Sequence, residues 1–124
     1  MQSKFNVKIL DNVADEMYFL TEKAREKILY NILKSTKLID QELLKKLTSN
    51  IWEFRTFYSN TYYRLLAFWD GSESLIIICT IFIKTTQKTP QNEIQKAENL
   101  RRKYFEEKNE TGNPWGNTRP LYRN

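Results

Sequence analysis

Three apolar stretches separated by short turns constrain the fold of this chain more than any other feature. The stretches IWEFRTFY, TYYRLLAFW and SLIIICTIFIK are rich in aromatic and β-branched residues, which favour strands. Ser59-Asn60 separates the first two, and Asp70-Gly71-Ser72 separates the last two. Both separators are typical turn sequences, and consecutive strands joined by such short loops must be antiparallel. The segment therefore predicts a three-stranded antiparallel meander.

The residues before the meander predict a strand followed by helices. Apolar and polar residues alternate over residues 4–10, which indicates a short strand with one buried face. Asp11 or Asn12 is expected to cap a helix that follows. From Val13 to Ile32 apolar residues recur at spacings of three and four, so this stretch predicts one long helix or two helices in line, broken near Thr21.

Asp40 is a plausible cap for a further helical turn that carries three leucines, at positions 43, 44 and 47. After the meander, Thr89 is expected to act as the N-cap of a last helix, with Pro90 at its first position. The whole order is strand, helices, three antiparallel strands and helix. This order predicts an α+β fold in which the meander packs its inner face against the helices.

The glycines and prolines divide the chain into two unequal parts. Two of the three glycines and two of the three prolines lie in KNETGNPWGNTRPLYRN. We therefore expect one domain over residues 1–107 and a polar tail over residues 108–124, flexible or laid on the surface. A cut after Lys108 should leave the melting temperature within a few degrees, because few core residues lie beyond it.

The composition excludes several classes of site. The chain has no histidine and one cysteine, Cys79, so it cannot build a zinc site of the usual nitrogen and sulfur kind or a Ser-His-Asp triad. Any catalysis must use Arg, Lys, Glu, Asp or Tyr, and we expect no cofactor and no metal. The formal charge of +5 suits an RNA or an acidic partner protein without requiring either. The single cysteine, the lack of a signal-like apolar segment and the absence of a long apolar run predict a cytoplasmic protein without a membrane span.

Candidate functional residues lie on one face of the expected meander. Side chains alternate along strands, so Glu53 and Arg55 point to the same side, and Arg64 can lie beside them across the hairpin. Like charges opposed on a sheet are destabilising, so such a cluster would favour an anion or a functional role. The alternative interpretation is that Glu53 neutralises one arginine on a solvated face.

Three more residues are weaker candidates. Lys84 and Lys88 follow the last strand and could extend the basic patch toward a phosphate, although lysines at a strand end are also common edge protection. Tyr104 shares the apolar stripe of the last helix, so core packing is the favoured interpretation, with a functional hydroxyl at the rim as the alternative.

The meander and the last helix carry an ordered set of motifs, namely Trp52-Glu53-Phe54-Arg55, Tyr63-Arg64, Lys84, Lys88-Thr89-Pro90, Glu93-Ile94 and Ala97. This set resembles the host-inhibition, HigB-like branch of the RelE/ParE toxin superfamily. In that family a strand reading W-E-[FL]-R precedes a strand with an aromatic residue before an arginine, and then K-x-x-x-K-T-P opens a helix with E-I-x-x-A. The resemblance covers roughly residues 4–107. Where the family often has H-G-[FI]-x-K-K, this chain reads TIFIKT over residues 80–85, so the histidine and the second lysine are replaced.

The resemblance implies a RelE-like fold and the toxin of a type II toxin–antitoxin pair. It implies a ribosome-dependent mRNA endonuclease that needs no metal, in which a neighbouring 2′-hydroxyl attacks the scissile phosphate. On that basis Arg64 and Arg55 would clamp the phosphate, Lys84 or Lys88 would assist the leaving group, and Glu53 or Tyr104 would help to move the proton. Arg64→Ala would then abolish toxicity and leave the fold intact if Arg64 faces solvent.

The implied partners are a cognate antitoxin, expected to be a helix-turn-helix protein, together with the ribosome and mRNA. Operator DNA would be bound only through the antitoxin, and no membrane is involved. Two other functions stay open at this point. One is a ParE-like inhibitor of DNA gyrase without nuclease activity, and the other is a degenerate domain that only binds its antitoxin.

Overall fold

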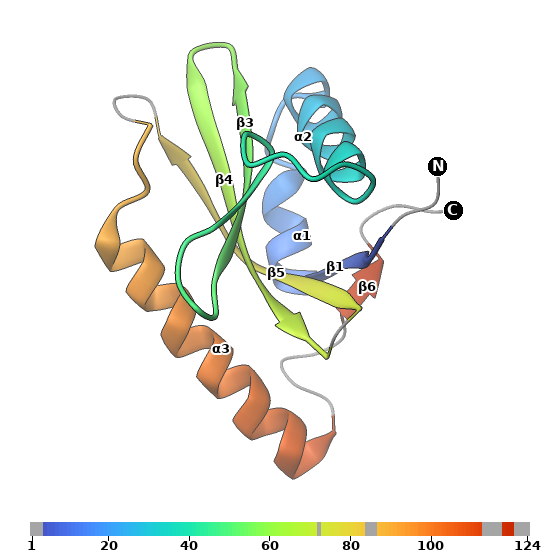
Figure 1. Cartoon of the computed structure of the whole chain (residues 1–124), viewed down its shortest axis with the longest axis vertical. Helices are drawn as coiled ribbons and strands as arrows, with labels where there is room; N and C mark the ends of the chain where they lie inside the picture. The colour runs from blue at the N-terminus through green and yellow to red at the C-terminus, as the bar shows by residue number, and fades with distance from the viewer. Residues whose placement is uncertain (1–3, 72, 84–86, 113–117, 121–124) are drawn as a thin grey trace.

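The computed structural model describes residues 4–71, 73–83, 87–112 and 118–120, which form one sheet with helices on both faces (Figure 1). In chain order the elements are β1 (Asn6–Leu10), α1 (Asp11–Met17), α2 (Glu22–Ser35), β2 (Leu44–Lys46), β3 (Trp52–Tyr58), β4 (Thr61–Asp70), β5 (Ser74–Ile83), α3 (Gln91–Thr111) and β6 (Thr118–Pro120). The expected α+β class is confirmed.

The meander is present where the sequence predicts it. β3 pairs antiparallel with β4, and β4 pairs antiparallel with β5. Ser59 and Asn60 both adopt positive φ angles, of 51° and 62°, in the β3–β4 turn. Two left-handed residues in a two-residue loop match the twist of the flanking strands, which explains why this hairpin is tight. Gly71, with φ of 77°, supplies the same conformation in the next turn.

The meander is only part of a larger mixed sheet. The strand order is β2-β3-β4-β5-β1-β6, with β1 parallel to β5 and β6 antiparallel to β1. The expected boundary at residue 107 falls inside α3, which runs to Thr111 and ends at Gly112, with φ of 76°. Beyond α3, the described residues of β6 return to the sheet. The independence of residues 108–124 from the domain stays a prediction.

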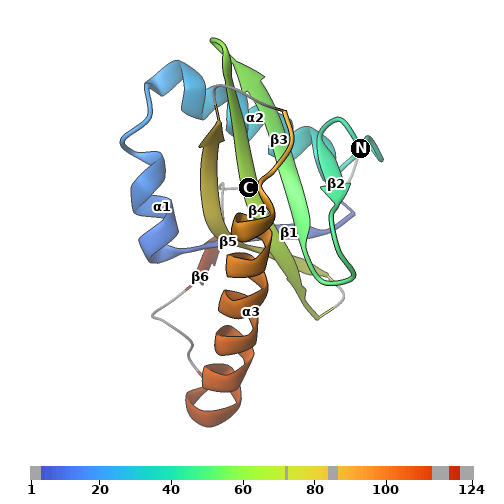
Figure 2. The same ribbon diagram turned by 90° about the vertical axis from the view of Figure 1, so that its left-hand side faces the viewer.

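The first helical region is two helices that are not in line. Thr21 is the N-cap of α2, and its hydroxyl oxygen accepts a hydrogen bond from the Ala24 amide at 3.2 Å. The break near Thr21 is therefore confirmed, and Figure 2 shows α1 and α2 pointing in different directions. Neither Asp11 nor Asn12 caps α1. Leu10 is the N-cap residue, without a side-chain hydrogen bond, and Asp11 is the first helical residue.

The expected helical turn after Asp40 is present in part. Oδ1 of Asp40 accepts a hydrogen bond from the Glu42 amide at 2.9 Å, and the Asp40 carbonyl accepts hydrogen bonds from the Leu43 and Leu44 amides at 3.0 Å. The turn does not continue to Leu47. The chain then enters β2, which pairs with β3 in the register Leu44 to Phe54 and Lys45 to Glu53. Backbone pairing with a distant strand outweighs the local leucine spacing, since that spacing also fits a short half-buried strand.

The two faces of the sheet are covered by different helices (Figure 2). On one face, Asn31 of α2 donates a hydrogen bond to Thr56 of β3 at 3.1 Å. On the opposite face, Tyr104 of α3 packs edge-on against Phe68 of β4, with ring centroids 5.0 Å apart. The meander therefore packs one face against α1 and α2 as expected. The expectation that the last helix lies on that face as well is wrong, because α3 covers part of the other face. No helix in the described part of the chain is long and apolar enough to cross a bilayer.

Candidate functional site

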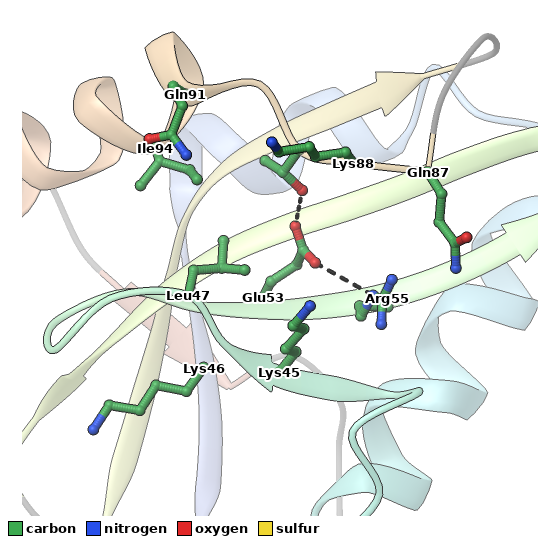
Figure 3. A pocket seen from close by; sticks show the side chains of 10 residues that line it. Lys45, Lys46, Leu47, Glu53, Arg55, Gln87, Lys88, Gln91 and Ile94 are labelled. Carbon is green, nitrogen blue, oxygen red and sulfur yellow. Dashed lines mark hydrogen bonds and ion pairs between the residues drawn. The ribbon is translucent and has the colours of Figure 1, made fainter.

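A basic groove lies where the start of α3 meets strands β2 and β3 (Figure 3). Its volume is about 530 Å³. Ten residues line it: Lys45, Lys46, Leu47, Glu53, Arg55, Gln87, Lys88, Thr89, Gln91 and Ile94. Four of these side chains carry positive charge and one carries negative charge. Such a lining suits an anionic group that enters from solvent.

Glu53 is the buried centre of this groove. Glu53 is only 2% exposed, and its carboxylate contacts two cationic side chains. Oε1 lies 3.3 Å from Nε of Arg55 and 3.7 Å from Nε of Arg64, and Oε2 accepts a hydrogen bond from the Thr89 hydroxyl. A buried carboxylate is costly unless it is paired and hydrogen-bonded, and here three side chains satisfy it. Glu53 is consequently held in one orientation.

Thr89 has a different role from the one expected. Pro90 is the N-cap residue of α3 and makes no side-chain cap, and Thr89 directs its hydroxyl to Glu53 instead. The helix begins one residue later than expected, so Thr89 lies outside the cap position, and its hydroxyl is free to donate a charge-assisted hydrogen bond to the carboxylate. Thr89 thereby ties the start of α3 to the centre of β3.

Arg55 and Arg64 are direct partners in the β3–β4 register, as the alternation of side chains predicted. Their exposure differs sharply. Arg64 is 2% exposed, and its Nη2 donates a hydrogen bond to the Gln87 carbonyl at 3.1 Å. Burial lowers the pKa of its guanidinium, the attraction of Glu53 opposes that shift, and the nearby charge of Arg55 adds to it.

The expectation that Arg64 faces solvent is therefore wrong. The Arg64 side chain is enclosed between Glu53, Arg55 and the segment at Gln87, so it contacts the site from the protein interior. Arg55 is the more accessible of the two, with 13% of its side chain exposed, and it lines the groove directly. Its Nη1 donates a hydrogen bond to the Gln41 carbonyl at 3.3 Å, which fixes the guanidinium at the groove edge.

Sequence reasoning missed two lysines of the groove. Lys45 lies directly opposite Glu53 in the β2–β3 register, and both Lys45 and Lys46 are exposed. In Figure 3, Lys45 points toward Glu53 and Arg55, whereas Lys46 points away from them. The pair of lysines in KKLTSNIWEF is visible in the sequence, but only the unexpected strand β2 brings it to the site. Lys88 lines the same groove as predicted, and Lys84 lies outside the described residues.

Tyr104 does not belong to the site. Its hydroxyl donates a hydrogen bond to Oδ2 of Asp70 at 2.7 Å, and its ring packs on Phe68. Burial, together with the hydrogen bond and charge of Asp70, raises the pKa of Tyr104. It does not line the groove around Glu53. The proposed proton-transfer role of Tyr104 is therefore corrected to a structural one.

The Asp70 carboxylate stabilises the fold at neutral pH, and this stabilisation is expected to be lost at acidic pH. Burial would raise the pKa of its carboxyl, but hydrogen bonds from Lys108 and Tyr104 outweigh burial and lower it. A depressed pKa contributes stability above the pKa of the unfolded carboxyl, about 3.9, and the contribution is lost as pH falls through the folded value. We expect Asp70→Asn to be less stable than the wild type at neutral pH, with the difference shrinking below about pH 4. Urea unfolding across pH measures this, and a difference independent of pH would contradict it.

Neither a metal nor a nucleophilic thiol is indicated among the described side chains. They contain no group of three His, Cys, Asp or Glu residues placed to hold a metal ion. Cys79 is buried, and burial raises the pKa of its thiol to about 12. A neutral thiol is a poor nucleophile, so Cys79 fits the expected role of a small apolar side chain. The groove can therefore bind an anion through its lysine and arginine side chains, next to the fixed carboxylate of Glu53.

Comparison with known proteins identifies the family. No curated protein sequence matches this chain. A solved structure of a double mutant of E. coli toxin RelE in the free state is 16% identical, with a TM-score of 0.49, and the match covers 82% of this chain and 98% of that one. The model of the family described as phage-derived protein Gp49-like (DUF891) matches residues 15–102, which include β3, β4 and most of α3. The chain therefore belongs to the Gp49-like family, a family of RelE-type toxins of toxin–antitoxin systems.

Proposed function

We propose that this toxin is a ribosome-dependent mRNA endonuclease that acts without a metal ion. The observation that carries the proposal is the groove in which Glu53 is fixed beside Arg55 and opposite Lys45. A phosphodiester needs cations that neutralise its non-bridging oxygens and a group that accepts a proton from the attacking hydroxyl. Residues of both kinds line this groove. RNA supplies its own nucleophile, the 2′-hydroxyl, so no activated protein side chain is required.

In the proposed reaction the 2′-oxygen attacks the adjacent phosphorus, and the bond from phosphorus to the 5′-oxygen breaks. The products are a 2′,3′-cyclic phosphate and a 5′-hydroxyl. Glu53 accepts the proton of the 2′-hydroxyl, and Lys88 donates a proton to the leaving 5′-oxygen. Arg55 and Lys45 bind the non-bridging oxygens, where charge accumulates in the transition state.

Arg64 is a positioning residue in this scheme. It contacts Glu53 from within the protein and holds the segment at Gln87, so its effect on RNA passes through these groups. The departure of the chain from the histidine of related toxins fits this arrangement, because Glu53 and the lysines supply acid–base groups without it. The family implies an antitoxin partner. We propose further that the antitoxin is a helix-turn-helix protein and that the toxin meets mRNA on the ribosome in the cytoplasm.

Expression of the toxin without its antitoxin is expected to arrest growth and to break transcripts within their coding regions. The breaks should appear only in messages that are being translated, so a transcript with a mutated start codon is the matched control. Primer extension maps the breaks, and pulse labelling of protein and DNA synthesis identifies the process that stops first. Intact messages during full arrest, with DNA synthesis stopping first, would favour inhibition of DNA gyrase instead.

The same assay in a purified translation system tests the independence from metal. Cleavage should persist in a chelator that removes zinc and other transition metals while magnesium is kept high enough for assembled ribosomes. Loss of cleavage that is restored by one added metal would contradict the proposed chemistry.

A further inference from the structure

An exposed aromatic pair lies next to the two arginines on the same face of the sheet. Phe57 and Tyr62 are partners in the β3–β4 register, and Arg55 and Arg64 are the neighbouring partners on that face. The Phe57 and Tyr62 rings lie 4.6 Å apart, tilted by 43°. Phe57, the residue before the last of β3, is 53% exposed. A large apolar side chain left open beside buried charges is a candidate for ligand contact.

A small pocket connects the aromatic pair to the basic groove. Its volume is about 120 Å³, and it lies at the edge of β3 beside Glu42 and Leu43, just before the first residue of β2. Phe57, Tyr62, Arg55, Arg64 and Gln87 are among the residues that line it. Arg55 and Gln87 line the larger groove as well. The two hollows therefore share a wall, and one ligand can occupy both.

We propose that Phe57 and Tyr62 form a base-binding subsite for single-stranded RNA, which takes the base of a nucleotide whose phosphate lies at Arg55. The proposal rests on the proposed function, because it assumes that the groove holds an RNA phosphate. It adds a contact to the base, for which the groove itself offers no aromatic surface.

The spacing of the two contacts fits one nucleotide. Neighbouring side chains on one face of a strand are about 7 Å apart along the strand. In a nucleotide, the base and the phosphate are separated by a single sugar, so the phosphate can lie at Arg55 while the base reaches Phe57. The Tyr62 ring is also held by Arg64, whose guanidinium lies over it with 5.2 Å between the guanidinium carbon and the ring centroid. Phe57 is left as the exposed stacking surface.

The subsite is expected to accept any of the four nucleobases. Every base has a flat π face, so stacking on an aromatic side chain tolerates all four bases. Arg55 and the lysines of the groove attract the phosphate that precedes the base. Phe19, which is 91% exposed at the connection between α1 and α2, lines neither of the two hollows. It is a matched aromatic control for Phe57.

Binding of short oligonucleotides to the purified full chain tests the subsite. The probe is a fluorescent, non-cleavable oligonucleotide with 2′-O-methyl sugars, compared with the same oligonucleotide that carries a single abasic position. We expect the wild type to bind the complete probe about fivefold to a hundredfold more tightly than the abasic probe when the gap falls at the subsite. Phe57→Ala should bind both probes equally, at the weaker affinity. Phe57→Trp should restore the preference, and Phe19→Ala should behave as the wild type.

Thermal melting of each variant shows whether it is folded, and Phe57→Leu serves if Phe57→Ala does not fold, since it keeps an apolar side chain without a π face. The proposal is overturned if the wild type binds the two probes equally for every position of the gap, if it binds neither probe, or if the folded alanine or leucine variant keeps the preference. Cleavage of translated mRNA by the wild type is measured separately. Cleavage without a preference for the complete probe would support the endonuclease and contradict the base-binding subsite. A preference for the complete probe without cleavage would support the subsite and contradict the endonuclease.

Discussion

Replacing Arg55 with alanine is expected to lower the rate of translation-dependent mRNA cleavage by about a hundredfold, the order observed when one preorganised charge-stabilising group is removed. Arg55 lines the groove beside Glu53 with part of its side chain open to solvent. The guanidinium can therefore reach a phosphate without rearrangement. Its removal leaves Glu53 with one cation fewer but relieves the repulsion between two arginines opposed in the sheet, so the fold should lose less than in Arg64→Ala, about 1 to 2 kcal/mol. Cleavage rate and melting temperature are measured on the same preparation.

Arg102→Ala is the matched control for this variant. Arg102 is exposed on α3 and is not among the residues that line the groove, so its replacement changes the net charge equally. Its cleavage rate should stay within about twofold of the wild type, since surface changes away from a site usually have small effects. An Arg55→Ala variant that cleaves as fast as Arg102→Ala would remove Arg55 from the proposed machinery.

Arg64→Ala is expected to destabilise the protein by about 3 kcal/mol, which is the usual cost of removing one partner from a buried ion pair. Because Arg64 is only 2% exposed, truncating its side chain leaves a cavity. The Gln87 carbonyl also loses the hydrogen bond that Arg64 donates to it. For a chain of this length such a loss lowers the melting temperature by roughly 10 °C. This reverses the expectation from the sequence, in which an exposed Arg64 was replaceable without cost to the fold.

Arg64→Lys separates charge from geometry in that result. Lysine keeps the positive charge near Glu53 but has no planar fork to reach Glu53 and the Gln87 carbonyl together. It should recover part of the lost stability and little of the cleavage. An Arg64→Ala variant that melts within 2 °C of the wild type would mean that the buried pair contributes almost nothing to the fold.

The sequence predicts the centre of the fold well, because local patterns decide it. Ser59-Asn60 fixes the β3–β4 hairpin, and the alternation along both strands then places Arg55 opposite Arg64. The break at Thr21 is similarly local, since Thr21 caps α2 with its own side chain. Such features depend on residues within a few positions of each other.

The sequence fails where contacts between distant segments decide the structure. Leu43 and Leu44 have helical spacing to Leu47, yet pairing with β3 makes a strand of residues 44–46 and brings Lys45 to the groove. Thr89 has the sequence signature of a helix cap, but α3 begins one residue later and the Thr89 hydroxyl donates to the carboxylate of Glu53 on a distant strand. The burial of Arg64 depends on the segment at Gln87, which follows it by more than twenty positions. None of these partners can be identified from neighbouring residues alone.

The place of β1 in the sheet bears on how this protein folds during synthesis. β1 pairs with β5 on one side, from Asn6 with Ser74, and with β6 on the other, from Lys8 with Pro120. Contacts between residues so far apart in the chain close large loops and form late. The sheet can close on both sides of β1 only after residues up to 120 have left the ribosomal exit tunnel. A nascent toxin therefore keeps one edge of β1 unpaired until β6 has emerged, which leaves this strand open to other polypeptides in that interval.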